Sequence, residues 1–160
     1  MFPLKMYVQK GSEKSMRLWI DGNIVLDVFQ KRDPHFADSS IVWKLCETKQ
    51  VEGYLSALTF ANLVYIMRKD LDLEKTNIVM EELAMIFHFT DLEVLDMKKA
   101  AMMQWDDFED AVQAVTAQRI HADYIITRNT QDFENSYVQA VTPRYFLEHL
   151  AGSNLIGRVY

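Results

Sequence analysis

The sequence predicts an α/β fold with a central, mainly parallel sheet that is covered by helices on both faces. Short apolar runs, such as residues 16–20 and 124–127, have the length and composition of buried strands. The longer stretches between these runs carry apolar residues at helical spacing. Chains in which strands and helices alternate form a parallel sheet with helices packed on its two faces.

The first half of the chain already shows this alternation. In order, we expect a strand at residues 16–20, helices at 24–29 and 37–47, a strand at 53–56, and helices at 59–68 and 73–87. In the first helix, Ile24, Val25 and Val28 recur at helical spacing. That helix ends before Pro34, because proline cannot continue it.

The second half continues the pattern up to a terminal helix. Residues 92–95 are expected to form a strand or a short connector, before a Met- and Ala-rich helix that extends to Trp105. The later elements are a helix at 107–120, strands at 124–127 and 138–141, and a helix at 144–150. Thr142 followed by Pro143 is typical of a helix start, because Thr caps the first turn and Pro is tolerated there.

Length and composition indicate one globular domain. The chain has 160 residues, of which 49% are hydrophobic and 25% are charged. It lacks the run of about eighteen apolar residues that a membrane-spanning helix needs, and the apolar core of a signal peptide. Its lone Cys46 excludes an internal disulfide and fits a reducing compartment. We expect a cytoplasmic protein with an appendage at residues 1–15, a domain at 16–150 and a tail at 151–160.

Asp21 follows the first predicted strand directly, at the carboxyl end of that strand. In parallel α/β sheets, functional sites gather where the strand ends meet the following loops. An aspartate in this place is also a common helix N-cap, which explains it without any function. Asn23, two residues later, either holds the Asp21 side chain by a hydrogen bond or caps the helix itself.

Asp107 and Asp110 are three residues apart at a predicted helix start, so both project from one face of the helix. Acids in a first turn are stabilised by the helix dipole, which again is an explanation without function. Asp110, however, adjoins Ala111 and Ala114, which are expected to pack on the sheet. A carboxylate so near the core usually needs a partner or a metal ion.

A third polar cluster follows the strand at residues 124–126. Its members are Thr127, Arg128, Asn129 and Asp132. The cluster is either an ordinary surface loop or a device that positions a metal-bound water.

Carboxylate, amide and hydroxyl oxygens are ligands for Mg²⁺ or Mn²⁺ rather than for zinc. One cysteine and four dispersed histidines show no zinc-ligand spacing, so the histidines are expected to be structural or surface residues. The sequence has no Gly-rich phosphate loop, nucleophile elbow or dinucleotide motif. The net charge of −6 argues against a protein that coats nucleic acid, but not against a nuclease whose carboxylates hold cations.

Four segments, in this order, resemble the motifs of PIN domains. They are residues 20–29 (IDGNIVLDVF), 110–117 (DAVQAVTA), 122–129 (ADYIITRN) and 141–147 (VTPRYFL). The last segment is similar to the terminal strand and helix of the VapC-like toxin branch, and the resemblance spans residues 16–150. It implies a three-layer α/β/α sandwich and hydrolysis of RNA phosphodiester bonds by metal-bound water.

The resemblance also assigns a role to each matching position. Asp21 and Asp110 take the places of the first and third metal-binding acids of the family. The second and fourth acids are replaced by amides, Asn62 after residues 56–59 (SALT), and Asn129. Because an amide carries no charge and cannot act as a base, we expect weaker cation binding. Asp107 and Asp132 are expected to compensate by holding a second ion or an attacking water.

The function implied is that of a metal-dependent endoribonuclease that uses Mg or Mn, the toxin of a toxin–antitoxin pair with an antitoxin protein as partner. The residues expected at the RNA substrate are Asn23, Asn62, Thr127, Arg128 and Asn129. At Arg128, an RNA phosphate contact and a solvated loop charge both stay open. The alternatives are a PIN-like domain that has lost catalysis and binds RNA or a protein, and an interaction module with no RNA role.

The middle of the chain predicts self-association. The apolar and aromatic residues there exceed what one helix face can bury, and four of them are Tyr65, Met67, Phe87 and Phe89. The family resemblance implies the same, because such domains commonly pair, and two-fold symmetry is the commonest arrangement of soluble oligomers. We expect a homodimer built on the middle helices.

Overall fold

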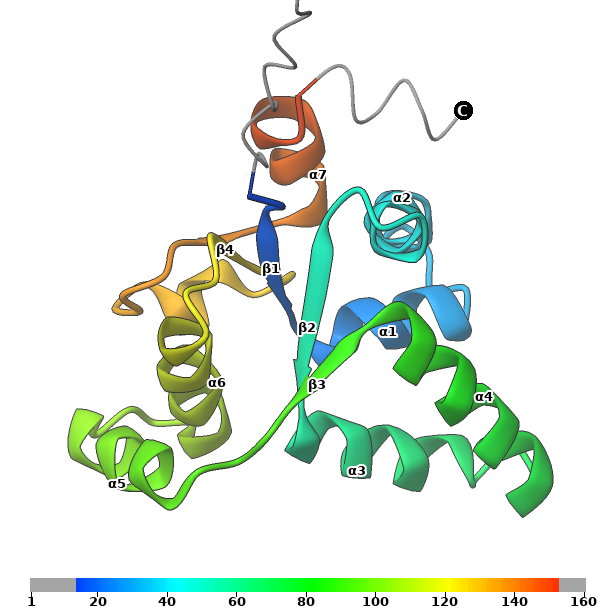
Figure 1. Cartoon of the computed structure of the whole chain (residues 1–160), viewed down its shortest axis with the longest axis horizontal. Helices are drawn as coiled ribbons and strands as arrows, with labels where there is room; N and C mark the ends of the chain where they lie inside the picture. Colours follow the sequence, from blue (N-terminus) through cyan, green and yellow to red (C-terminus); the bar gives the residue numbers. More distant parts are fainter. Residues whose placement is uncertain (1–13, 153–160) are drawn as a thin grey trace, which may run out of the picture.

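The computed structural model of the protein describes residues 14–152. In this part of the chain, parallel strands form a 5-stranded sheet in the order β3-β2-β1-β4-β5 (Figure 1). The strands are β1 (Arg17–Ile20), β2 (Glu52–Ser56), β3 (His88–Thr90), β4 (Tyr124–Ile126) and β5 (Ala140–Val141). Because all strands are parallel, the residues that follow β1, β4 and β5 leave the sheet at the same edge.

Helices connect the strands. They are α1 (Gly22–Phe29), α2 (Phe36–Glu47), α3 (Ala57–Met67), α4 (Leu73–Ile86), α5 (Val94–Met103), α6 (Phe108–Arg119) and α7 (Pro143–Tyr145). A 3-10 turn follows β4 at Thr130–Phe133, and α7 continues into a π-helical turn at Phe146–Leu150. Most predicted elements therefore lie where the sequence placed them, with ends that differ by a few residues.

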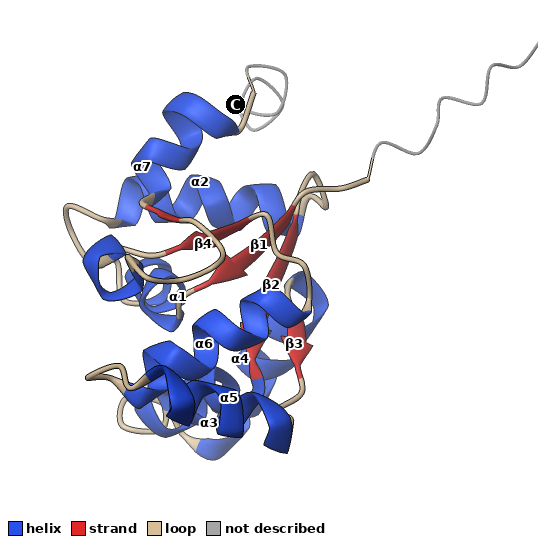
Figure 2. Cartoon of the chain, turned by 90° about the vertical axis from the view of Figure 1, so that its left-hand side faces the viewer, coloured by secondary structure: helices blue, strands red, loops and turns tan. Residues whose placement is uncertain are grey.

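The two faces of the sheet carry separate apolar cores. Leu18 and Ile20 of β1 belong to a large core on one face, to which α1, α2, α3 and α4 contribute. Trp19, between them, points to the other face and packs with Ala114 and Ala117 of α6. In Figures 1 and 2, α5 and α6 lie on the opposite side of the sheet from α1, α2 and α4. The predicted three-layer α/β/α sandwich is confirmed.

The strand expected at residues 92–95 is wrong. The third strand in the sequence lies earlier, at His88–Thr90, and α5 begins at Val94. The side chains of Leu92, Val94 and Leu95 are 36%, 72% and 55% exposed, so this apolar run is not a buried strand. Only the alternative offered for these residues, a connector, describes residues 91–93.

The predicted terminal segments lie largely outside the described residues. Of the appendage at residues 1–15, the structure describes residues 14–15, and of the tail at 151–160 it describes 151–152. The division into appendage, domain and tail stays a prediction. None of the helices in residues 14–152 is long and apolar enough to cross a membrane.

Candidate active site

Asp21 is buried at the carboxyl end of β1, where its side chain is 9% exposed. Its Oδ2 accepts a hydrogen bond of 2.8 Å from the Thr127 hydroxyl, and its Oδ1 accepts one of 3.3 Å from the Asn23 backbone N–H. Thr127 follows β4, which pairs with β1, so two adjacent strand ends bring the pair together. Asp21 is thus the N-cap of α1, and the backbone of Asn23, rather than its side chain, makes the hydrogen bond.

Burial raises the pKa of Asp21 above its usual value. The hydrogen bonds from Thr127 and Asn23 and the positive charge of Arg128 lower this pKa, while the charge of Asp27 raises it. A helix cap needs none of this burial. The burial of Asp21 is therefore not explained by its role as a helix cap.

The start of α6 supplies further carboxylates. Asp107 is the N-cap of this helix, and its Oδ1 accepts a hydrogen bond of 3.1 Å from the Asp110 backbone N–H. Asp107 therefore has a structural role as the cap of α6, while Asp110 and Glu109 are the acids of its first turn. Asp110 is partly buried beside Ala111 and Ala114, which are 0% and 2% exposed, as the sequence predicted.

Burial and acidic neighbours together raise the pKa of Asp110 to about 7. Burial is the largest cause, followed by the charges of Asp107, Asp21, Asp132 and Glu109. These carboxylates come from the end of β1, the start of α6 and the turn after β4, yet they act on one another. We call the five residues the acidic centre. A carboxyl group whose pKa is shifted in this way is typical of catalytic and cation-binding sites.

Glu109 was not among the residues selected from the sequence. Its Oε1 accepts a hydrogen bond of 3.3 Å from the Asn62 side-chain amide of α3. Burial and the charges of Asp107 and Asp21 raise its pKa, and the Asn62 amide opposes them. The neutral Asn62 thus contacts a carboxylate from a neighbouring helix. The sequence does point to Glu109 in one way, because this residue lies between Asp107 and Asp110.

The acidic centre borders two cavities. The smaller cavity, of about 120 Å³, is lined by Asp21 and Glu109 together with Asn23 and Asn62. The larger cavity, of about 490 Å³, is lined by the other members of the centre, Asp107, Asp110 and Asp132. The structure therefore brings together seven of these residues in one region.

Two predicted residues of the loop after β4 have other surroundings. The side chain of Asn129 is exposed and lines neither cavity, and its backbone N–H donates to Thr127 Oγ1 at 3.1 Å. Arg128 Nε lies 3.2 Å from Oδ2 of Asp27, a residue of α1 that is 0% exposed. Arg128 is therefore not a freely solvated loop charge, as one of the two interpretations held. A substrate role for either residue stays a prediction.

The oxygen donors of the acidic centre suit a hard divalent cation, but its side chains lie too far apart to hold one in this structure. Carboxylate and amide oxygens are the donors that Mg²⁺ and Mn²⁺ prefer. Burial and the repulsion among these carboxylates raise the pKa of Asp110 to about 7, and the repulsion is relieved when a cation lies among them. Within residues 14–152, however, no three His, Cys, Asp or Glu side chains are grouped closely enough to hold a metal ion.

Comparison with known families identifies the domain. The sequence model of the PIN domain matches residues 17–131, which include β1, α6 and β4. The chain belongs to the PIN domain family. No curated protein sequence matches it.

Solved structures with similar folds support the same assignment. The chain superposes with a TM-score of 0.60 on a chain of a toxin–antitoxin complex from Klebsiella pneumoniae, with 20% identity, 79% of this chain and 97% of that chain covered. DNA-bound VapBC from Salmonella typhimurium gives a TM-score of 0.61 with 15% identity, covering 80% of this chain and 98% of that chain. FitAcB from Neisseria gonorrhoeae gives 0.56 with 19% identity, covering 80% and 99%. At these identities the likeness establishes a PIN fold of the kind found in VapC-like proteins.

Proposed function

We propose that this PIN domain is a metal-dependent endoribonuclease that hydrolyses phosphodiester bonds of RNA with Mg²⁺ or Mn²⁺. The observation that carries the proposal is the acidic centre, in which burial and the charges of carboxylates from three segments raise the pKa of Asp110 to about 7. Nothing in a helix start or a surface loop needs such a concentration of like charge. Such a concentration of like charge is expected of residues that share a cation.

Each residue of the centre has a role in this proposal. Asp21 and Asp110 would hold the cation, and Asp107 or Asp132 would hold a second ion or orient the attacking water. A bound divalent cation lowers the pKa of water and offsets negative charge on the phosphate. Thr127 keeps the Asp21 carboxylate in place through its hydrogen bond of 2.8 Å. Glu109 supplies the charge that the amide at position 62 lacks, since the two side chains are in contact.

A second candidate function is favoured by the two amides. Asn62 and Asn129 stand where the family resemblance places acids, and no preformed metal group occurs among residues 14–152. A PIN domain with weakened catalysis would bind RNA or a protein without cleaving it. The two candidates differ in one observable property, which is metal-dependent cleavage.

The deciding experiment measures cleavage of single-stranded RNA with Mg²⁺, with Mn²⁺ and with EDTA. Asp21→Asn and Asp110→Asn should each abolish cleavage and divalent-ion binding while circular dichroism stays unchanged. Asp106→Asn is the matched control, because Asp106 adjoins the centre but is not among the charges that raise the pKa of Asp110. RNA binding without cleavage by the unaltered protein would support the second candidate. Unchanged Mn²⁺ affinity in both Asp variants would remove the basis of the site.

We also propose an antitoxin partner and action in the cytoplasm. Support for the partner comes from the fold similarity to chains of toxin–antitoxin complexes, together with the VapC-like terminal segment at residues 141–147. The lone Cys46, buried in the core, supports a reducing compartment. Copurification with the product of an adjacent gene for a small DNA-binding protein would test the partner.

The proposed homodimer on the middle helices needs other side chains than most of those first named for it. Met67 and Phe87 are 1% and 4% exposed, so they belong to the core, and Phe89 packs edge-on against Phe60. Of the four residues named for dimerisation, only Tyr65 is largely exposed, at 70%. Exposed apolar residues remain on α3 and α4, namely Tyr65, Leu73, Ile78 and Met85. Light scattering at micromolar concentration would contradict the dimer if the mass stays near 18.7 kDa.

A further inference from the structure

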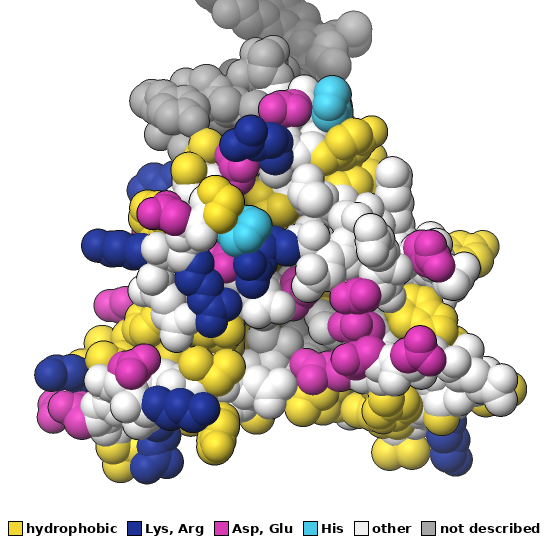
Figure 3. Space-filling view, turned by 180° about the vertical axis from the view of Figure 1, so that it is seen from behind, with side chains coloured by type: hydrophobic (Ala, Val, Ile, Leu, Met, Phe, Trp, Pro, Cys, Tyr) yellow, Lys and Arg dark blue, Asp and Glu magenta, His cyan; other side chains and the backbone are white. Residues whose placement is uncertain are grey.

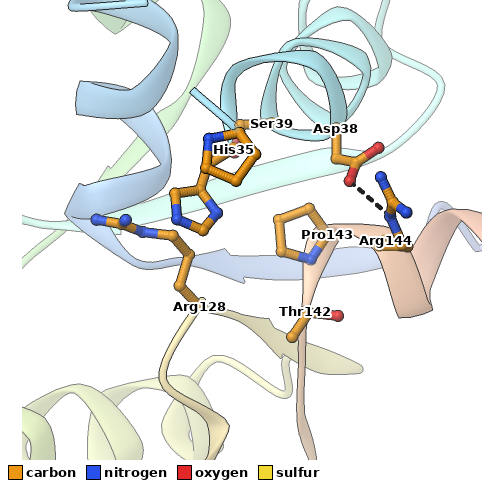
Figure 4. Close-up of a pocket in the computed structure, with 8 residues that line it drawn as sticks. His35, Asp38, Ser39, Arg128, Thr142, Pro143 and Arg144 are labelled. Carbon is orange, nitrogen blue, oxygen red and sulfur yellow. Dashed lines mark hydrogen bonds and ion pairs between the residues drawn. The ribbon is translucent and has the colours of Figure 1, made fainter. Parts of the chain in front are cut away.

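A third cavity opens at the same sheet edge as the two cavities of the acidic centre, but its lining has the opposite charge character. It has a volume of about 370 Å³ and is lined by His35, Asp38 and Arg128, and by Thr142 and Arg144 after β5. In Figure 4, the His35 side chain lies beside Arg128, and Pro143 separates this pair from Asp38 and Arg144. We call this the basic cavity.

The side chains that line the basic cavity carry more positive than negative charge. Buried Asp27 lies 3.2 Å from Arg128 Nε and 4.0 Å from the Arg32 guanidinium, so two arginines share one carboxylate. Asp38 Oδ2 accepts a hydrogen bond of 3.0 Å from Arg144 Nε. Two arginines and one aspartate line the cavity, which leaves one positive charge in excess beside the imidazole of His35. Arg32 lies outside this lining and offsets part of the charge of Asp27. A cavity of this kind suits an anion.

Arg128 connects the basic cavity with the acidic centre. It follows Thr127, whose hydroxyl donates to Asp21 Oδ2, and its positive charge lowers the pKa of Asp21. Asp27 fixes the position of Arg128 from inside the protein, where the Asp27 side chain is 0% exposed. Figure 3 shows one face of the molecule, on which Lys and Arg side chains, with some Asp and Glu among them, lie mostly on the left and a group of Asp and Glu side chains lies right of the centre.

We propose that the basic cavity binds a phosphate group of the RNA strand that neighbours the phosphate cleaved at the acidic centre. This inference rests on the proposed function, because it takes the acidic centre as the place of cleavage. An RNA backbone carries a negative charge at every nucleotide, and arginines bind phosphate oxygens through paired N–H donors. Carboxylates at the centre repel such a strand unless cations and a neighbouring basic surface hold it. The basic cavity supplies that surface for the RNA phosphate next to the one that is cleaved.

The test measures binding of a short, fluorescein-labelled single-stranded RNA to the full chain by anisotropy, in EDTA, over a series of KCl concentrations. Each phosphate contact that is lost reduces the slope of log K against log[salt] by about 0.7 for a single strand. Arg144→Gln should reduce the slope by about this amount and weaken binding roughly fivefold at moderate salt. His35→Gln should weaken binding with a smaller change of slope.

Two further variants distinguish RNA binding at the basic cavity from a general effect of lost charge or of misfolding on RNA affinity. Asp38→Asn removes the carboxylate that accepts from Arg144, so it should tighten binding, which misfolding cannot do. Lys75→Gln in α4 is the matched control, because Lys75 also forms an exposed ion pair, at 3.7 Å from Asp72, but lies away from the cavity. It should leave both affinity and slope close to those of the unaltered protein.

The outcomes distinguish this inference from the proposed function. If Arg144→Gln and Asp38→Asn behave like Lys75→Gln, the basic cavity does not bind RNA, even in a protein that cleaves it. If they shift binding in opposite directions but no metal supports cleavage, the cavity stands and the nuclease proposal falls. A chain that binds no RNA at all in EDTA overturns the inference.

Discussion

Asp27 and Asp110 show two ways in which one fold can place a carboxylate near its core. Asp27 is 0% exposed, but Arg128 and Arg32 lie beside it and Ser39 donates a hydrogen bond of 3.4 Å to it. Asp110 is less deeply buried, but its charged neighbours are all acids, and its pKa is raised to about 7. The two carboxylates therefore differ chiefly in the charge of their neighbours, which is positive at Asp27 and negative at Asp110, rather than in how deeply they are buried.

This contrast separates a structural carboxylate from a functional one. A buried charge that has opposite charges around it contributes to the folded state and loses that contribution when its partner is removed. Like charges held together weaken the folded state, and proteins keep such strain mainly where a ligand or a reaction uses it. Asp27 belongs to the first kind and Asp110 to the second. Substitutions at the two positions should therefore change stability in opposite directions.

The largest effect is expected for Asp27→Asn. The substitution leaves Arg128 and Arg32 without their shared carboxylate, and breaking a buried pair from one side costs about 3 kcal/mol. The value is at the lower end because both arginine side chains keep contact with water, at 25% and 35% exposure. For a chain of this size, the melting temperature should fall by about 6–12 °C. Asp38→Asn, whose partner Arg144 is exposed, should melt close to the unaltered protein, and a similar loss there would contradict the contrast.

Asp110→Asn should instead stabilise the metal-free protein. Asp110 keeps its proton up to about pH 7 in the folded state but ionises near its usual value of 3.8 when unfolded. Its contribution to stability is therefore complete below pH 3.8 and is lost as the pH rises to about 7. Because the amide cannot ionise, the variant should be more stable than the unaltered protein at pH 8, by about 1 kcal/mol after allowance for solvent screening.

The pH dependence is the decisive part of this measurement. Thermal melts in EDTA should show a gain of about 2–4 °C for Asp110→Asn at pH 8 that shrinks towards pH 4. Asp106→Asn serves as the control for loss of one acidic charge nearby. A gain that stays constant with pH, or equals that of the control, would mean that Asp110 ionises normally.

The sequence predicted the fold where burial and periodicity agree. Along β1, Leu18, Trp19 and Ile20 are all buried because both faces of a central parallel strand are covered, and such a strand is a continuous apolar run. The same logic failed at residues 92–95, where an exposed apolar run spans the end of the connector after β3 and the first residues of α5. Whether an apolar run is covered depends on the packing of distant segments, which local pattern does not contain.

Site residues could be predicted from the sequence where their position depends only on the strand or helix that carries them. Asp21 and Asp110 were found by their places at a strand end and beside an apolar helix face. Glu109 was missed because adjacent residues of a helix point in different directions, and the packing of α6 decides which one meets Asn62. The pairing of Arg128 with Asp27 joins the loop after β4 to α1, and neither segment alone indicates it.

The smallest effect on stability is expected for Asn62→Glu, which adds an acid to the centre instead of removing one. The Asn62 amide donates to Glu109 Oε1 at 3.3 Å, so the new carboxylate would repel Glu109 and slightly lower the melting temperature in EDTA. The same charge should tighten Mn²⁺ binding, because a further anionic oxygen ligand favours a hard cation. We expect a gain of up to about tenfold in affinity, which corresponds to about 1.4 kcal/mol. Asn129→Asp is the matched control, since Asn129 also stands at a family acid position but lines neither cavity of the centre. Calorimetry that finds equal or weaker Mn²⁺ binding for Asn62→Glu would place Asn62 outside the coordination shell, and a larger gain for Asn129→Asp would move the missing ligand to the loop after β4.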